Sequence, residues 1–242
     1  MKRGVRCGNH GSLLVGSIAC GGKVALIIPS DSTADVPDAD RYRGFADLAS
    51  SQTLGRDYDI LVRRCGDSRV AVIAPHAGEI EDGTSEIARA IAGDDFNLYL
   101  FEGRRPAHNY RALHLTSHLF DEPQCLALIA GCTTVIAVHG CAGAEHTLLL
   151  GGRDRSLRDR LAAGLRATGV AASTQGHPFP AVHPHNICNR GATGRGVQIE
   201  FPNPLRKPIP ARFVAAVVRR VLATVATPCG DAIDPLRSGT HA

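Results

Sequence analysis

The stretch SRVAVIAPHAGEIEDGTSEIARAIAG, residues 68–93, decides the fold class. Its first half is apolar and rich in β-branched residues, which predicts a buried strand over residues 68–78. From Thr84 onward the apolar residues follow helical spacing, and Gly93 closes the pattern, so a helix is predicted there. A buried strand that passes through a polar loop into a helix is one unit of an α/β fold.

The rest of the chain repeats this alternation of strands and helices. Further strands are predicted over residues 57–66, 96–103, 133–143, 146–154 and 197–207, and helices over residues 42–52, 156–169 and 208–226. Residues 114–132 predict a short strand followed by a helix, and residues 177–196 a long loop. The near-continuous apolar strands indicate a single α/β domain, with a mixed, mostly parallel sheet flanked by helices.

Composition supports one folded domain of ordinary size. The chain has 242 residues, of which 44% are hydrophobic. Its net charge of +4 is unevenly spread, with −4 in residues 1–150 and +8 in residues 151–242. The basic second half suits an anionic ligand, or it is a solvated basic face. Aromatic residues make up only 5% and do not interleave with basic runs, so nucleic-acid binding is not expected.

The ends of the chain lie outside this domain, which we place at residues 41–228, with a tail over residues 229–242. Residues 1–40 have a basic start and an apolar middle, the outline of a secretory signal, although Lys23 interrupts the apolar run. A disordered or non-native extension is the alternative. A secreted chain and a cytoplasmic chain released on lysis therefore both stay open. The apolar stretch is too broken for a membrane span, so no stable membrane insertion is expected.

The eight cysteines include no CxxC pair, which argues against a zinc ribbon or a thioredoxin-like motif. The chemistry is instead expected where three predicted strands end in polar side chains. His76 and His139 each follow an apolar run and precede small residues, and Glu200 ends a third run. Ligands bind at the carboxyl ends of strands in open α/β sheets, so the three groups should converge.

Two histidines and one nearby acid form the ligand set of a catalytic zinc, with a fourth position open for water. Spacing alone leaves Glu79 and Glu81 both available as the acid. Glu200 is a candidate general base that takes a proton from water and passes it to a leaving amine. The alternatives are a packed or capping role for each histidine and a salt bridge for Glu200.

Arginines near these strands are candidate substrate ligands. The stretch NICNRGATGRG offers Asn189, Arg190 and Arg195, and GGRD offers Arg153. Arginine can hold a carboxylate through two hydrogen bonds, which an acidic polymer would need. The alternative is an ordinary surface loop. The polar stretch over residues 109–123 is interpreted as a rim loop or as support for the metal ligands.

A series of blocks resembles one family. YRGFADLA, VAVIAPHAGEIEDGTSEIARAIAG, YLFEG, LHLTSHLFDEP, VIAVHGCAG, GGRD, NICNRG and GVQIE occur in the order found in phage-type poly-γ-glutamate hydrolases, from about Tyr42 to Arg206. The resemblance implies a zinc carboxypeptidase-like fold, one catalytic zinc ion and cleavage of γ-glutamyl amide bonds.

Residue by residue, the resemblance assigns His76, Glu81 and His139 to the metal and Glu200 to catalysis. The sequence departs from the family where Ala77 and Glu79 replace glycines, which adds a second acid beside the first histidine. Glu79 would give the His-x-x-Glu spacing of zinc carboxypeptidases at large. The preference for Glu81 therefore rests on the resemblance.

The leading hypothesis is a zinc-dependent amidohydrolase, expected as a monomer, that acts on poly-γ-glutamate. One alternative is a carboxypeptidase or small-molecule deacylase with the same zinc site. The other is a non-catalytic module that binds an acidic polymer. Glu200 distinguishes the two enzyme hypotheses from the binding module, because a binding module has no need of a general base.

Overall fold

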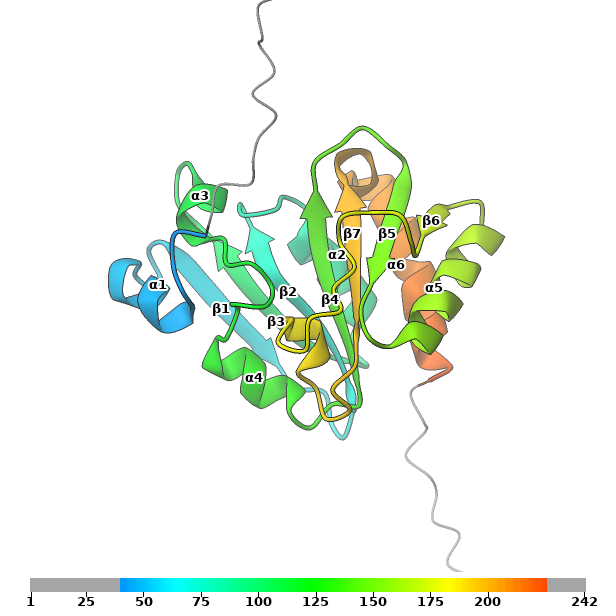
Figure 1. Ribbon diagram of the computed structural model, residues 1–242, viewed down its shortest axis with the longest axis horizontal. Helices are drawn as coiled ribbons and strands as arrows, with labels where there is room; N and C mark the ends of the chain where they lie inside the picture. The colour runs from blue at the N-terminus through cyan, green and yellow to red at the C-terminus, as the bar shows by residue number, and fades with distance from the viewer. Residues whose placement is uncertain (1–39, 226–242) are drawn as a thin grey trace, which may run out of the picture. The chain divides into compact units, whose positions relative to one another are not determined.

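A computed structural model describes residues 40–225, and within them seven strands form one sheet in the order β1-β3-β2-β4-β7-β5-β6 (Figure 1). The strands are β1 (Tyr58–Arg63), β2 (Val70–Gly78), β3 (Asn97–Gly103), β4 (Thr134–Cys141), β5 (Thr147–Gly151), β6 (Ala171–Ser173) and β7 (Val197–Pro202). Four neighbouring pairs are parallel, whereas β1 with β3 and β5 with β7 are antiparallel. The predicted mixed, mostly parallel sheet is confirmed.

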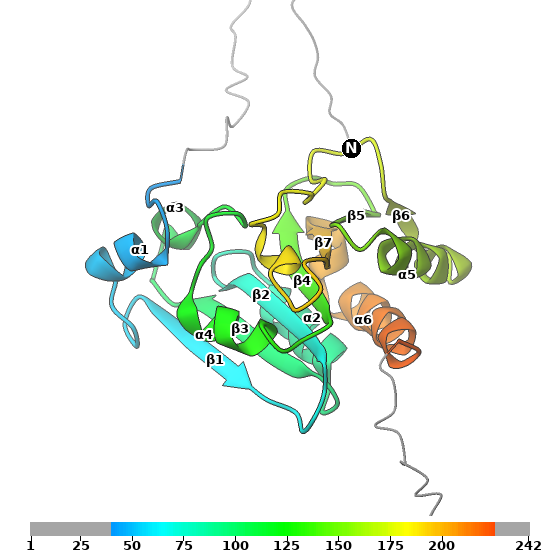
Figure 2. The same cartoon turned by 60° about the horizontal axis from the view of Figure 1, so that its bottom comes forward.

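Helices cover both faces of the sheet, as the turned view shows (Figure 2). One face packs against α2 (Thr84–Ala92), α5 (Arg155–Ala167) and α6 (Pro208–Ala223). The other packs against α1 (Phe45–Ser51), α3 (Asn109–Leu113) and α4 (Pro123–Ile129). Two short 3-10 turns, η1 (Ile187–Asn189) and η2 (Asn203–Arg206), flank β7. The two apolar clusters hold the strands rigidly, so side chains at the strand ends have fixed positions.

Strand β2 changes face before it ends. Val72 and Ala74 belong to the apolar cluster on the α2 side, and strict alternation would put His76 there too. The register of β2 against β3 shifts between Ala74 and Ala77, and Ala77 returns to the α2 side. The His76 ring instead lies edge-on to Phe120, which packs in the cluster on the opposite face. The irregularity thus directs His76 away from α2.

Most predicted elements are present, with three differences. The short strand expected before α4 is wrong: residues 114–122 contain no strand, and their backbone groups bond locally, as in Leu119 N–H to Thr116 O. Helix α3 and strand β6 were not expected. Helix α4 begins at Pro123, where the Glu122 carboxylate accepts two backbone N–H groups.

Expectations for residues 1–39 and 226–242, including the possible signal and the tail, lie outside the described residues. Between residues 40 and 225, no helix combines the length and apolarity that a membrane crossing would need.

Candidate metal and catalytic site

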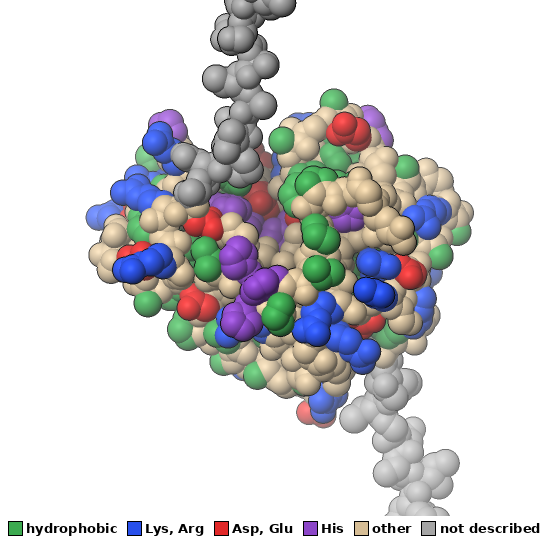
Figure 3. Space-filling view, viewed as in Figure 1, with side chains coloured by type: hydrophobic (Ala, Val, Ile, Leu, Met, Phe, Trp, Pro, Cys, Tyr) green, Lys and Arg blue, Asp and Glu red, His purple; other side chains and the backbone are tan. Residues whose placement is uncertain are grey.

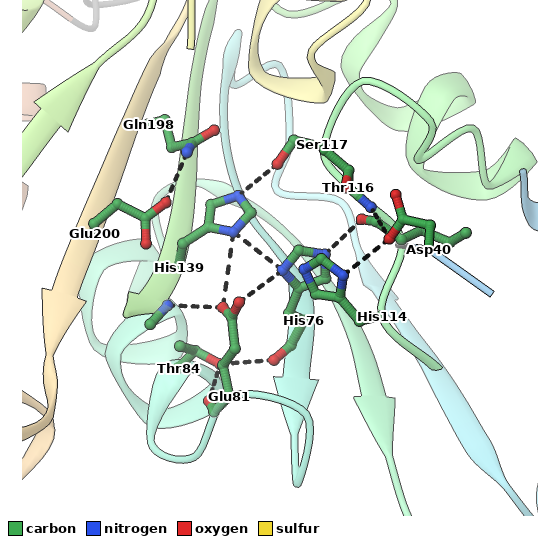
Figure 4. Close-up of polar contacts among 12 residues, drawn as sticks. Asp40, His76, Glu81, Thr84, His114, Thr116, Ser117, His139, Gln198 and Glu200 are labelled. Carbon is green, nitrogen blue, oxygen red and sulfur yellow. Dashed lines mark hydrogen bonds and ion pairs between the residues drawn. The ribbon is translucent and has the colours of Figure 1, made fainter. Parts of the chain in front are cut away.

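Three neighbouring strands, β2, β4 and β7, bring His76, His139 and Glu200 together at one edge of the sheet (Figure 4). His139 and Glu200 lie directly opposite one another in register. All three side chains are almost completely buried, at 1%, 2% and 4% exposure. Figure 3 shows histidine side chains gathered in a hollow near the centre of this face. The predicted convergence at the carboxyl ends of the strands is therefore what the fold provides.

Glu81 joins the two histidines from the loop that follows β2. Its Oε1 lies 3.0 Å from His76 Nδ1, and its Oε2 lies 3.7 Å from His139 Nδ1. Oε2 also accepts a hydrogen bond of 2.7 Å from the backbone N–H of Gly140. The Thr84 hydroxyl holds the loop by bonding to the carbonyl oxygens of Glu81 and His76. The carboxylate is thus fixed between the two rings.

The contact between His76 Nδ1 and the Glu81 carboxylate is favourable only when a proton or a metal ion lies between them. His76 Nε2 lies 2.8 Å from the carbonyl oxygen of Leu115, which can only accept, so Nε2 carries a hydrogen. In the neutral ring Nδ1 then presents a lone pair to the Glu81 carboxylate, and two acceptors face each other. Burial lowers the pKa of His76, but the charge and hydrogen bond of Glu81, together with Leu115 and Glu200, raise it overall. A proton or a metal ion between the two groups removes the conflict.

The separations fit a metal ion. His76 Nδ1 and His139 Nδ1 are 3.2 Å apart. Ligand atoms bound at about 2.0–2.1 Å in a tetrahedral zinc site are about 3.3 Å from one another. The contacts of 3.0, 3.2 and 3.7 Å among His76, Glu81 and His139 bracket that value. A backbone carbonyl on the far nitrogen of His76 is also the usual partner of a metal-bound imidazole.

A third histidine, His114, lies near the same point. His76, Glu81 and His114 place one possible ligand atom each within 4.8 Å of one another. His114 stacks on Tyr110, and its Nδ1 lies 3.1 Å from Asp40 Oδ1. Two histidines and Glu81 therefore form a group that can hold a metal. His76 and Glu81 are common to it, and the third ligand is either His139 or His114.

Other potential ligands are less well placed. Glu79 is exposed, whereas Glu81 is buried at 8% exposure. Cys141 and Cys188, whose pairing the sequence left open, are both free thiols. Burial raises the pKa of Cys141 to about 12, so it is not a thiolate near neutral pH. Glu81 is thus the glutamate that contacts both histidines, and its role as a metal ligand stays a prediction.

Glu200 lies beside this group but is not part of it. Its Oε1 accepts a 2.7 Å hydrogen bond from Gln198 Nε2, and Gln198 Oε1 accepts one of 2.9 Å from Asn186. Burial raises the pKa of Glu200 to about 8, and the charge of Glu81 acts in the same direction. A positioned carboxyl group with a raised pKa is suited to accepting and returning a proton.

The loop between α3 and α4 closes one side of the site. Ser117 Oγ lies 3.4 Å from His139 Nε2, and the Asp40 carboxylate accepts from the Thr116 N–H. The supporting role expected for this polar stretch agrees with these contacts. Asp40 falls at the end of the segment interpreted as an N-terminal extension, and no local pattern marked it as part of the fold.

The structure does not bring Arg190, Arg195 and Arg153 to this edge. Between the first two, Ala192 N–H bonds to Cys132 O and Thr193 Oγ1 to Thr133 O, just before β4 begins. Thr133 precedes His139 by six residues, or about 20 Å along an extended strand. Arg153 lies beside Asn189, which accepts from its N–H. The three exposed arginines are therefore at the opposite end of β4 and β7 from the histidines.

The side-chain amide of Asn189 has no hydrogen-bonding position left for a substrate. Its amide nitrogen donates to the carbonyl oxygens of Ala181 and His183, at 2.8 and 3.0 Å. Its amide oxygen accepts from the N–H groups of Arg153 and Gly196, at 3.2 and 3.1 Å. An asparagine amide makes at most four such bonds, and this one makes four. The geometry corrects the expected role from substrate binding to fixing the loop.

One further arginine, Arg206, lies close to the loop of Glu81 and to the end of β4. It ends η2 and lies beside Gly140, which follows His139. It follows Glu200 by six residues, across a turn that contains proline, and no periodic pattern in the sequence linked it to the site. The resemblance reached this residue without assigning it a role.

Comparison with known proteins identifies similar sequences. A sequence profile described as poly-gamma-glutamate hydrolase matches residues 42–220. UPF0714 protein YndL of Bacillus subtilis (strain 168) is 38% identical over 170 residues, which cover 69% of this chain and 66% of that protein. The SPbeta prophage-derived UPF0714 protein YoqZ of the same strain is 34% identical over 180 residues, covering 74% and 64%. The chain thus spans about two thirds of the length of these relatives.

Two solved structures share the fold. A bacteriophage poly-gamma-glutamate hydrolase superposes with a TM-score of 0.73 and 31% identity, over 77% of this chain and 98% of that one. A zinc-free apo form of YndL gives a TM-score of 0.71 and 32% identity, over the same shares of the two chains. Sequence and structure therefore agree that this chain belongs to the poly-γ-glutamate hydrolase family.

Proposed function

We propose that the chain hydrolyses γ-glutamyl amide bonds of poly-γ-glutamate and holds one zinc ion for the reaction. The observation that carries this proposal is the convergence of His76, His139 and Glu81 within 3.0–3.7 Å, beside a buried Glu200. When bound there, zinc would polarise the scissile carbonyl and lower the pKa of its water. The matching family and the zinc-free form of a relative support this choice of substrate and metal.

Glu200 moves the proton in this reaction. Its carboxylate accepts a proton from the attacking water as the C–O bond forms, and it returns that proton to the nitrogen as the C–N bond breaks. Gln198 donates to one of its oxygens and fixes the direction of the other. The products are a carboxylic acid and an amine, so no further reactant is needed.

Within the metal group we assign the third ligand to His139 and a supporting place to His114. His139 Nδ1 is directed at His76 Nδ1, 3.2 Å away, whereas Nδ1 of His114 is engaged by Asp40. Zinc content separates the choices: we expect about one ion per chain in His114→Ala and none in His139→Ala. Full occupancy in His139→Ala would overturn the assignment.

The function is tested by the chain length of the polymer. Purified protein with zinc should shorten poly-γ-glutamate, and a chelator should stop this until zinc is restored. α-Linked polyglutamate is the matched control substrate, because it has the same charge and a different linkage. Zinc-loaded protein that leaves the γ-linked polymer intact would refute the proposal, whatever its effect on the control.

A further inference from the structure

We propose that a basic pocket beside the metal group is a second substrate site, which binds a carboxylate of the γ-glutamyl chain a short distance from the scissile amide. The pocket has a volume of about 270 Å³ and is lined by Arg41, Arg105, His108, Arg111 and Ala112. This site rests on the proposed function and would hold the polymer outside the residues that react.

The pocket lies at the edge of the sheet that carries the metal group. Strands β2 and β3 are parallel neighbours, and Gly78 at the end of one pairs with Gly103 at the end of the other. His76 precedes Gly78 by two positions, and Arg105 follows Gly103 by two. The carboxyl ends of the two strands therefore bring one wall of the pocket and His76 to the same edge.

The pocket is also on the same face of the sheet as the His76 ring. Ala112 belongs to α3 and packs in the same apolar cluster as Phe120, against which the His76 ring lies edge-on. Tyr110, also in α3, stacks on His114, whose ring centroid is 4.2 Å from that of His76. The helix that forms one wall of the pocket therefore contacts the group of histidines directly.

A second wall comes from the segment that precedes α1. Asp40 accepts a 2.9 Å hydrogen bond from the Thr116 N–H, and its Oδ1 lies 3.1 Å from His114 Nδ1. Arg41 is the next residue, so its backbone is fixed against the loop that borders the site. Its guanidinium lies 5.5 Å from the ring centroid of the buried Tyr42. Arg41 is thus held close to the histidines although its side chain is exposed.

Two of the arginines in the pocket have hydrogen-bond donors to spare. Arg105 Nη1 donates to Gln52 Oε1 at 2.8 Å and to Asp57 Oδ1 at 2.9 Å, which fixes the guanidinium. Among residues 40–225, Arg105 Nη2 has no hydrogen-bond partner, and the Arg41 guanidinium has neither a hydrogen bond nor an ion pair. A guanidinium offers five N–H donors in a planar fork that fits a carboxylate.

The charges around the pocket favour an anion. Asp57 is shared between Arg56 and Arg105, so one acid faces two cations. The carboxylate of Asp40, the acid next to Arg41 in the chain, is engaged by the loop after α3. Basic side chains gather over α1 and α3, to one side of the hollow (Figure 3). Positive charge therefore remains for a ligand that comes from outside.

The substrate of the proposed reaction supplies carboxylates at a regular interval. Each γ-linked residue keeps a free α-carboxylate, and five bonds separate the carbons that carry neighbouring ones, about 6 Å in an extended chain. Helix α3 is two ring contacts, with centroid distances of 4.2 and 4.4 Å, away from His76. A carboxylate one or two residues from the scissile amide is therefore within reach of the pocket.

The test measures equilibrium binding of two γ-linked decamers, one with free α-carboxylates and one with α-carboxamides, in the presence of a chelator so that neither is cleaved. We expect wild type to prefer the carboxylate form, and Arg41→Gln to lose roughly 3- to 10-fold in affinity for that form alone. Arg41→Lys should recover part of the loss, because the charge remains and the fork does not. With zinc-loaded protein, the loss should appear in KM and not in kcat, since Arg41 contacts no reacting group.

Arg43→Gln is the matched control. It removes the same charge two residues further on, where the exposed Arg43 pairs with Asp47, and it should leave both affinities unchanged. Wild-type affinity in Arg41→Gln, an equal loss for both decamers, or an equal loss in Arg43→Gln would each overturn the pocket as a carboxylate site. If zinc-loaded wild type leaves the polymer intact, the proposed function fails, and the binding measurement still decides the pocket.

Discussion

Replacing Asn189 by alanine should destabilise the protein severely while leaving the catalytic groups in place. The change removes four hydrogen bonds to backbone groups, two of which belong to the exposed residues Arg153 and His183, where water can substitute. The carbonyl of Ala181 and the N–H of Gly196 are buried and would be left without partners. An unsatisfied buried group costs about 1–3 kcal/mol, so the free energy of unfolding should fall by about 2–6 kcal/mol.

Urea denaturation followed by circular dichroism measures this loss. With a slope of about 2 kcal/mol per molar urea, the midpoint should fall by about 1–3 M. Arg190→Ala is the matched control: it changes the exposed neighbour of Asn189, and its effect should stay within about 0.5 kcal/mol. If Asn189→Ala keeps the wild-type midpoint and only raises KM for the polymer, the residue contacts substrate and our assignment is wrong.

Three further predictions concern the site and its surroundings. Glu81→Gln should empty the metal site, whereas Glu79→Gln should keep about one zinc per chain by mass spectrometry; the reverse result would exchange their roles. Glu200→Gln should retain zinc and lose about 10²- to 10⁴-fold in kcat on poly-γ-glutamate, because the amide cannot accept a proton. Retention of zinc together with wild-type kcat would exclude Glu200 as the base. Among the described thiols, native protein at pH 7 should be alkylated at partly exposed Cys65 and not at Cys125, whose pKa burial raises well above its ordinary value. Peptide mapping checks this, and early modification of Cys125 would contradict the burial of α4.

The sequence predicts the strand ends well because apolar runs on parallel strands end at one edge. His139 and Glu200 also obey simple alternation along β4 and β7: their neighbours Val138 and Ile199 pack on the α2 side, and they point the other way. Simple alternation along β2 would direct His76 toward α2. The register shift in β2 directs it into the site instead.

The arginines show where sequence reasoning was incomplete. Arg195 lies just before β7, and residues before a parallel strand lie at the edge opposite its carboxyl end. That rule was available from the sequence and argued against placing Arg190 and Arg195 beside Glu200. Arg206 follows β7 and so lies at the edge formed by the carboxyl ends of the strands. Its position depends on close contacts with Gly83 and Gly140, which a linear pattern does not reveal.

The register shift in β2 also limits how this site can be altered or transplanted. The spacing from His76 to Glu81 is visible in the sequence, but the orientation of the histidine is set upstream of it, between Ala74 and Ala77. Deleting Ala77 would restore regular pairing with His76 still two residues after Ala74, and would turn the imidazole toward α2 with the sheet itself retained. A designer who grafts residues 76–81 onto a regular strand, two residues after a position that faces α2, would therefore copy His76 and Glu81 and still leave the imidazole on the wrong face of the sheet.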